Sequence, residues 1–185
     1  VCSSDLPWSW STTEEYFAAF DGNLGVNAGF LVGHSAMRRT VMGDEATQRH
    51  ATPDEVARMA DLLRAGLAAG GMGFSSSWAE THNDAAGDGV PSRAASVEEL
   101  EFLARVAGEF EGTVLEFIPT ARDFTEEHCD VMTRMSVAAQ RSLNWNVLTV
   151  SAANRDAAER RLAAGDYARE RGGRVVALTI PSPPR

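Results

Sequence analysis

The sequence predicts an α/β fold with a parallel sheet. Short apolar runs of strand length alternate with longer segments in which apolar residues repeat at helical spacing. Strand and helix signals that alternate in this way are typical of repeated βα units. About five such units follow one another without a glycine-rich GxGxxG fingerprint. This pattern favours part of a TIM-like (β/α)8 barrel over a doubly wound sheet.

Capping residues mark where the helices begin. Thr52 is placed as an N-cap, Pro53 at the first helical position and Glu55 as the partner in a capping box, and Gly70–Gly71 ends this helix. Helices are also predicted in STTEEYFAAF, where Ser11 or Thr12 can cap, and in SVEELEFLARVAGEFEG, where Ser96 and Glu99 repeat the capping pattern. Two more are predicted in TEEHCDVMTRMSVAAQR and NRDAAERRLAAGDYARERGG.

Five apolar runs between these helices are predicted as strands, because they are too short for helices and are bounded by turn residues. They are Val26–Gly33, Gly71–Ser76, Thr113–Pro119, Leu143–Val150 and Arg174–Pro181. Five strands cannot close an eight-stranded barrel, so residues 7–185 are expected to be the central part of an incomplete barrel domain. The first six residues, VCSSDL, match one reading frame of a common sequencing adapter, and we expect residues 1–6 not to be native.

Composition excludes several classes of protein. The chain has 185 residues, of which 44% are hydrophobic, and a net charge of -9, which argues against a nucleic-acid partner. No apolar run reaches about 18 residues, so no membrane span is expected. The first residues lack the pattern of a signal peptide, and a cytoplasmic location is expected. All 17 basic residues are arginines, which excludes lysine chemistry from this segment. The oligomeric state is left open.

In a barrel, the chemistry lies in the loops that follow the C-terminal ends of the strands. The loop between Ser76 and Ser96 is long and polar, and loops of this length are usually functional or disordered. We predict that His82, Asn83 and Asp84 bind substrate. The alternative is a solvated loop in which Asn and Asp make local turns.

The same loop supplies two further candidates for substrate binding. Arg93 follows Ser92 and can close the loop over an acidic substrate. Trp78 opens the loop and can form an apolar pocket for an acyl group.

Two candidates lie after the first predicted strand. His34 is predicted at the pocket wall or near a metal ion, and the alternative is a hydrogen-bonded histidine that fastens the loop. Arg38 can bind a substrate carboxylate through two hydrogen bonds, and the alternative is a structural ion pair.

Three polar residues interrupt apolar strands. Glu116 is a candidate metal ligand, because a buried carboxylate is costly unless it is paired or bound to a metal; the alternative is an ion pair with an arginine. Asn144 and Asn146 lie two residues apart and therefore face the same side of a strand. They are predicted to contact substrate inside the barrel, with a structural hydrogen-bond network as the alternative.

Three segments carry a resemblance to a known family. They are NAGFLVGHSAMRRTVMG, ATPDEVARMADLLRAGLAAGGMGFSSS and SVEELEFLARVAGEFEGTV. In order and spacing they resemble the amidohydrolase superfamily, in particular the branch of the N-acyl-D-amino-acid deacylases. The resemblance spans residues 8–112 most closely. It implies a TIM-like barrel in which zinc or another divalent metal activates a water that attacks the amide carbonyl of a small molecule.

The resemblance also implies where the metal ligands and the catalytic acid should lie. An aspartate after the last barrel strand, expected outside this chain, transfers the proton. Single histidines are expected at the ends of the fifth and sixth strands, where TVLEFIP offers Glu116 and LNWNVLTV offers Asn144 and Asn146. Three hypotheses remain open: a hydrolase of non-peptide C–N bonds, a metal-free or catalytically altered binding protein, and a hydrolase of another bond.

Overall fold

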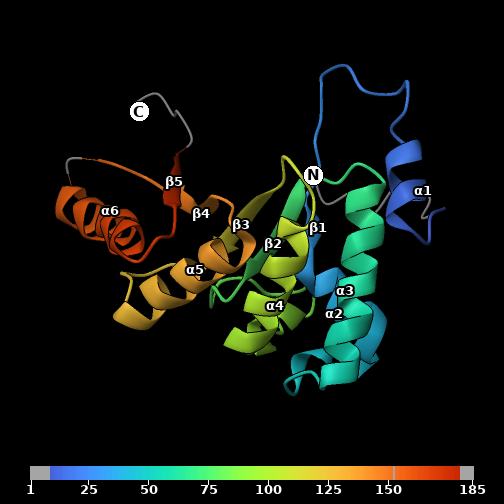
Figure 1. Cartoon of the computed structure of the whole chain (residues 1–185), viewed down its shortest axis with the longest axis horizontal. Helices are drawn as coiled ribbons and strands as arrows, with labels where there is room; N and C mark the ends of the chain where they lie inside the picture. The colour runs from blue at the N-terminus through green and yellow to red at the C-terminus, as the bar shows by residue number, and fades with distance from the viewer. Residues whose placement is uncertain (1–8, 152, 180–185) are drawn as a thin grey trace.

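The computed structural model describes residues 9–151 and 153–179, so the predicted adapter-derived segment lies outside the described residues. Five parallel strands form one sheet in the order in which they occur along the chain (Figure 1). The strands are β1 (Val32–Gly33), β2 (Gly73–Ser77), β3 (Val114–Ile118), β4 (Leu143–Leu148) and β5 (Val175–Thr179). The predicted α/β fold with about five consecutive βα units is therefore confirmed.

One helix precedes β1, and the other helices connect successive strands along one side of the sheet (Figure 1). They are α1 (Thr13–Ala18), α2 (His34–Met42), α3 (Pro53–Ala68), α4 (Val97–Gly108), α5 (Glu126–Ala139) and α6 (Arg155–Glu170), with 3-10 turns η1 (Gly43–Thr47) and η2 (Pro91–Ala94). Thr52 and Glu55 form the predicted capping box of α3, and Thr12 and Glu15 form one at α1. None of the helices described here is long and apolar enough to cross a membrane.

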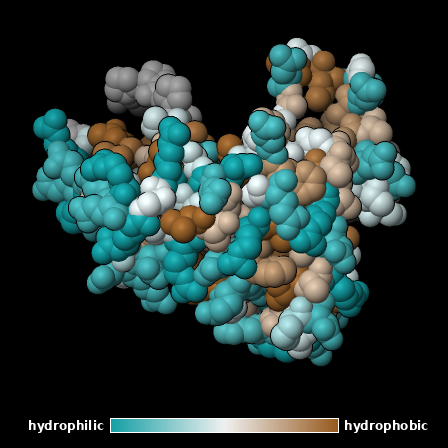
Figure 2. Space-filling view, in the orientation of Figure 1, coloured by the Kyte–Doolittle hydropathy of each residue, from teal (hydrophilic) through white to brown (hydrophobic). Residues whose placement is uncertain are grey.

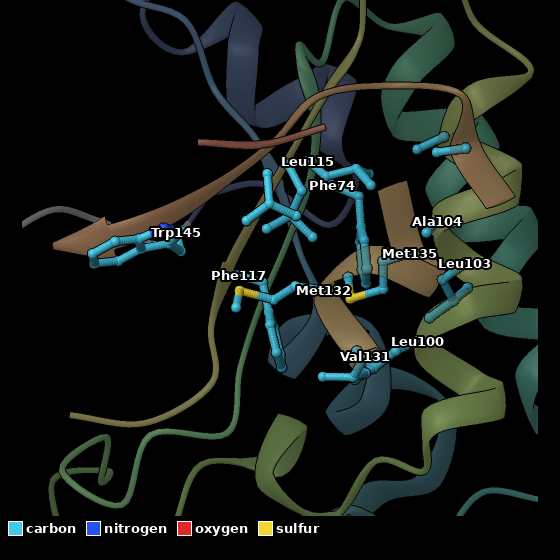
Figure 3. Packing of buried hydrophobic residues seen from close by; sticks show 14 of the residues in the cluster. Phe74, Leu100, Leu103, Ala104, Leu115, Phe117, Val131, Met132, Met135 and Trp145 are labelled. Atoms are coloured by element: carbon cyan, nitrogen blue, oxygen red, sulfur yellow. The ribbon is translucent and has the colours of Figure 1, made fainter. Parts of the chain in front are cut away.

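The core lies between the sheet and these helices. Along β3, Leu115 and Phe117 are buried, whereas Val114, Glu116 and Ile118 are half-buried, because successive side chains of a strand point to opposite faces. Figure 3 shows Phe74 and Leu115 packed toward side chains of α4 and α5. The labelled helix residues there are Leu100, Leu103, Ala104, Val131, Met132 and Met135. In a closed βα barrel the opposite face of such a sheet lines the interior, and it is called the inner face below.

The predicted strand Val26–Gly33 is wrong over most of its length. Only Val32–Gly33 pairs with β2, and upstream of it the carbonyl of Phe30 accepts a hydrogen bond from the Met72 amide at 2.8 Å. Before that point the chain lines a hollow beside α1, and Val26 is 75% exposed. Hydrophobic surface is visible on this loop in Figure 2. Within this run, Phe30 stacks on Phe17 of α1, with ring centroids 5.3 Å apart. An apolar residue in the run therefore packs on a neighbouring helix without forming a strand.

Candidate functional site

A cavity of about 360 Å³ opens at the C-terminal ends of β3 and β4. Active sites of parallel βα barrels lie at this edge of the sheet. The loop after β2, the loop after β3, the end of β4 and helix α6 all contribute to its wall. Its lining residues are Thr81, His82, Ile118, Thr120, Ala121, Phe124, Trp145, Asn146, Val147, Thr149 and Arg161. Of the residues predicted from the sequence, the cavity brings together His82 and Asn146.

Glu80 braces the two loops that form the cavity. Its Oε2 accepts hydrogen bonds from the Thr120 hydroxyl at 3.0 Å and from the Ala121 amide at 3.3 Å. Its Oε1 lies 2.9 Å from Nε of Arg122. A hydrogen bond from its own backbone amide, followed by those from Thr120 and Ala121, lowers the pKa of Glu80 to about 2. The carboxylate therefore stays ionised at neutral pH and holds the loop after β2 against the loop after β3.

Asn146 and Arg161 supply polar atoms at the cavity. Asn146 Oδ1 is buried and has no hydrogen-bond partner among the described residues. Leaving a buried acceptor unpaired costs about 1–3 kcal/mol, so a donor that reached this oxygen would be favoured. Arg161 Nη2 donates to the Ala121 carbonyl at 2.9 Å, and its guanidinium lies 5.9 Å from the centroid of the Phe124 ring.

The polar loop after β2 is an ordered, hairpin-like turn. Asp84 Oδ1 accepts from the Ala86 amide at 2.9 Å and from the Asp88 amide at 3.0 Å, as in the local turns foreseen as the alternative for this residue. Asn83 Oδ1 accepts from Arg93 Nη1 at 3.0 Å. Asn83, Asp84 and Arg93 thus shape the loop, and direct substrate contacts by these three residues stay predictions.

Serine hydroxyl groups fasten both ends of this loop. The Ser92 hydroxyl donates to the Ser77 carbonyl at 2.8 Å, which ties the end of the loop to the end of β2. The Ser35 hydroxyl donates to Ser92 Oγ at 3.0 Å and accepts from the Ser92 amide at 3.1 Å. The first turn of α2 therefore anchors the loop that carries His82.

His34 and Arg38 belong to a buried network on the helix side of the sheet. His34 Nε2 lies 2.8 Å from Glu99 Oε1, and His34 Nδ1 lies 2.8 Å from Ser76 Oγ. Arg38 Nη1 donates to both oxygens of Glu99 at 2.5 Å, and Arg38 Nη2 donates to the backbone carbonyls of Ala46 and Arg49.

The side chains of His34 and Arg38 are fully buried and bind other parts of the chain. In the described structure these two residues therefore act as structural contacts, and direct substrate contact by either stays a prediction. A histidine that fastens the chain and a structural ion pair were the alternatives that the sequence left open.

This network predicts a dependence of stability on pH. Burial lowers the pKa of His34 below its ordinary value of 6.5, against the raising effect of Glu99. In the folded state His34 then takes up its proton at lower pH than in the unfolded state. The free energy of unfolding is therefore expected to fall as the pH drops below about 6.5, because the unfolded state binds the extra proton.

Urea denaturation between about pH 7.5 and 5 measures this dependence. His34→Gln is expected to flatten the fall in the unfolding midpoint, whereas His50→Gln, on an exposed histidine, is expected to retain it. Equal slopes in the two variants would contradict the assignment to His34.

Glu116 lies on the inner face of the sheet. Strand pairing aligns Ser75, Glu116 and Asn144 in one row across β2, β3 and β4. Within residues 9–151 and 153–179 there is no group of three or more His, Cys, Asp or Glu side chains that could hold a metal ion. An amide oxygen is a poor zinc ligand, so the described residues do not by themselves fit a zinc centre. Glu116 as a metal ligand and Asn144 as a substrate contact stay predictions.

Trp78 packs on the core and does not line the cavity. Its ring meets the Phe117 ring edge to face, with centroids 5.5 Å apart. The apolar wall of the cavity comes from Ile118, Phe124, Trp145 and Val147. Sequence reasoning missed Phe124, Glu80 and Arg161, because only the fold brings these residues from three different segments to one edge.

Comparisons with known proteins agree with this architecture. No family model matches the chain. A D-aminoacylase from Alcaligenes xylosoxydans xylosoxydans is 48% identical over 50 residues, which cover 27% of this chain and 10% of that protein. An uncharacterized protein, Rv2913c, from Mycobacterium tuberculosis is 45% identical over 71 residues, which cover 36% of this chain and 12% of that protein. The matched segments thus span only about a tenth of each relative's length.

Solved structures of D-aminoacylase are similar to the chain over most of its length. One, described as defining a novel subset of amidohydrolases, superposes with a TM-score of 0.69 at 24% identity, over 91% of this chain and 33% of that chain. Another, with a TM-score of 0.68, concerns the binuclear metal center of D-aminoacylase. At this identity the likeness shows the fold alone, which is similar to that of part of D-aminoacylase.

Proposed function

We propose that the protein carrying this chain is an amidohydrolase that cleaves the non-peptide C–N bond of small N-acyl amino acids, with preference for the D-enantiomer. The observation that carries the proposal is the cavity at the C-terminal edge of a parallel βα sheet whose fold is similar to that of D-aminoacylase. The 48% identity to a D-aminoacylase over 50 residues supports the same reaction class.

The proposal gives this chain the substrate-binding wall and not the metal centre. His82, Asn146 and Arg161 supply polar groups beside an apolar surface, which is the composition typical of small-molecule sites. Amidohydrolase chemistry uses a divalent metal ion that activates a water molecule. Since the described residues offer one inner-face carboxylate, Glu116, and no metal-binding cluster, we assign no reaction step to a metal.

A metal-free or catalytically altered binding protein is the second candidate. The asparagines Asn144 and Asn146 favour it, because they occupy β4, where the resemblance implies an imidazole ligand. Such a protein would retain the cavity and bind the same small molecules without cleaving them. The third candidate function is hydrolysis of a bond other than an amide, at a rearranged site.

Turnover and metal content together test these candidates. The protein is purified from its complete reading frame with zinc in the medium and incubated with matched N-acetyl-D- and N-acetyl-L-amino acids, and released amine is measured. We expect cleavage of the D-series, about one or two bound divalent ions per molecule, and loss of at least about tenfold in rate after chelation.

Other outcomes decide against the proposal. Bound metal without cleavage of any amide would favour hydrolysis of another bond. Neither metal nor cleavage would favour the binding protein.

A further inference from the structure

Two arginines beside the cavity at the ends of β3 and β4 have only one nearby carboxylate to neutralise them. Asp123 faces two arginines of α6: Arg160 Nη2 lies 2.6 Å from Asp123 Oδ2, and Arg161 Nε lies 3.8 Å from Asp123 Oδ1. The close hydrogen-bonded pair is the one with Arg160. Arg161 donates a hydrogen bond to a neutral carbonyl, that of Ala121. Two guanidinium groups thus share one carboxylate, in a chain whose net charge is -9.

Arg161 is also partly desolvated. Its side chain is 21% exposed, lies beside the Phe124 ring and lines the cavity. Partial removal from water strengthens attraction between charges, and a guanidinium binds a carboxylate through charge-assisted hydrogen bonds. The cavity therefore favours a ligand that carries a carboxylate.

Two other features of the wall restrict the ligand further. Asn146 Oδ1, a buried acceptor without a partner among the described residues, calls for a hydrogen-bond donor. Ile118 and Val147 provide an apolar surface in the same cavity. A volume of about 360 Å³ is near the lower end of the range for small-molecule pockets.

We infer that this cavity is the subsite for the amino-acid half of the substrate, with Arg161 binding the α-carboxylate, Asn146 Oδ1 accepting from the amide N–H, and a small apolar side chain packing on Ile118 and Val147. In an N-acyl α-amino acid one carbon atom joins the amide nitrogen, the carboxylate and the side chain, so these three groups arrive together. The inference rests on the proposed function for the identity of the substrate. Arg161 and Asn146 are binding residues in it and take no part in bond cleavage.

The test compares an acid with its neutral ester. The probes are N-acetyl-D-leucine and its methyl ester, which differ in the negative charge. KM is measured where a probe is cleaved, and Kd by calorimetry where it is not. Arg161→Gln is expected to raise this constant for the acid at least about tenfold and to change it for the ester less than about twofold.

Two further variants make the comparison specific. Arg169→Gln removes the same charge from α6 but at an exposed ion pair with Asp166, and we expect both probes to bind as before. Asn146→Asp keeps the acceptor oxygen and adds a negative charge. It is expected to weaken binding of the acid and not of the ester. If thermal denaturation shows that Arg161→Gln does not fold, Asn146→Asp serves as the test in its place.

The outcomes separate this inference from the proposed function. Equal effects of Arg161→Gln on acid and ester, or no effect on either, would overturn the subsite even if amides are cleaved. Binding of the acid that depends on Arg161 without any cleavage would support the subsite while the proposed hydrolysis fails.

Discussion

Replacing Glu99 by alanine is expected to lower the free energy of unfolding by about 3–5 kcal/mol. The carboxylate binds both Arg38 and His34, and all three side chains are buried. Its removal leaves the Arg38 guanidinium as an uncompensated charge in the interior, which is a far larger penalty than the loss of an exposed ion pair.

Glu101 provides a matched control on the same helix. It pairs with Arg105 at 3.0 Å and with Arg134 at 2.8 Å near the surface. Glu101→Ala is expected to cost at most about 1 kcal/mol, because solvent screens such pairs. Urea denaturation followed by tryptophan fluorescence measures both variants. If the two substitutions cost the same, the buried network contributes no more to stability than surface pairs do.

The Glu99→Ala substitution is also expected to affect the cavity. The Glu99 carboxylate is hydrogen-bonded to His34, and His34 is hydrogen-bonded to Ser76. The carbonyl of the next residue, Ser77, accepts from Ser92 at the far end of the loop that carries His82. Loss of the Glu99 carboxylate removes a partner from both Arg38 and His34, and we expect the hydrogen bonds that fasten this loop to β2 to weaken. We expect Glu99→Ala to weaken ligand binding at His82 and Asn146 although it touches neither.

Glu99 illustrates where sequence reasoning succeeds and where it stops. Ser96 caps α4 as predicted, because its hydroxyl accepts from the Glu99 amide at 3.2 Å. A glutamate three residues after the cap normally turns back to complete a capping box. Here its side chain turns inward to a histidine 65 positions away in the sequence. Backbone position followed from local pattern, whereas the side-chain partner depended on packing between α2 and α4.

The candidate site shows the same division. The rule that chemistry follows the C-terminal ends of strands predicted the edge at which the cavity lies and two of its lining residues, His82 and Asn146. Arg161 gave no local signal, because it stands in an arginine-rich helix among several exposed cations. Its contacts with Ala121 and Phe124 exist only because α6 packs beside the loop after β3.

Gly73→Ala is expected to be as damaging as loss of Glu99, for a steric reason. Gly73 begins β2 with a φ of 153°, and a Cβ at this position would overlap the carbonyl oxygen of Val114 on the adjacent strand. Glycine inside a strand often marks such a close approach of two backbones. Because a backbone atom cannot rotate away, β2 would have to move relative to β3, and the residue would also keep a strained φ. We expect a loss of about 3 kcal/mol.

Gly25→Ala is the control, since a Cβ there would meet no atom within 4 Å and the same methyl group is added. It is expected to change the free energy of unfolding by less than about 0.5 kcal/mol. A shift of β2 would also break the alignment of Ser75 with Glu116 and displace the loop that starts after Ser77. Gly73→Ala should therefore lose ligand binding together with stability. If Gly73→Ala instead keeps the stability and the ligand binding of Gly25→Ala, the close pairing of β2 with β3 does not set the position of the cavity.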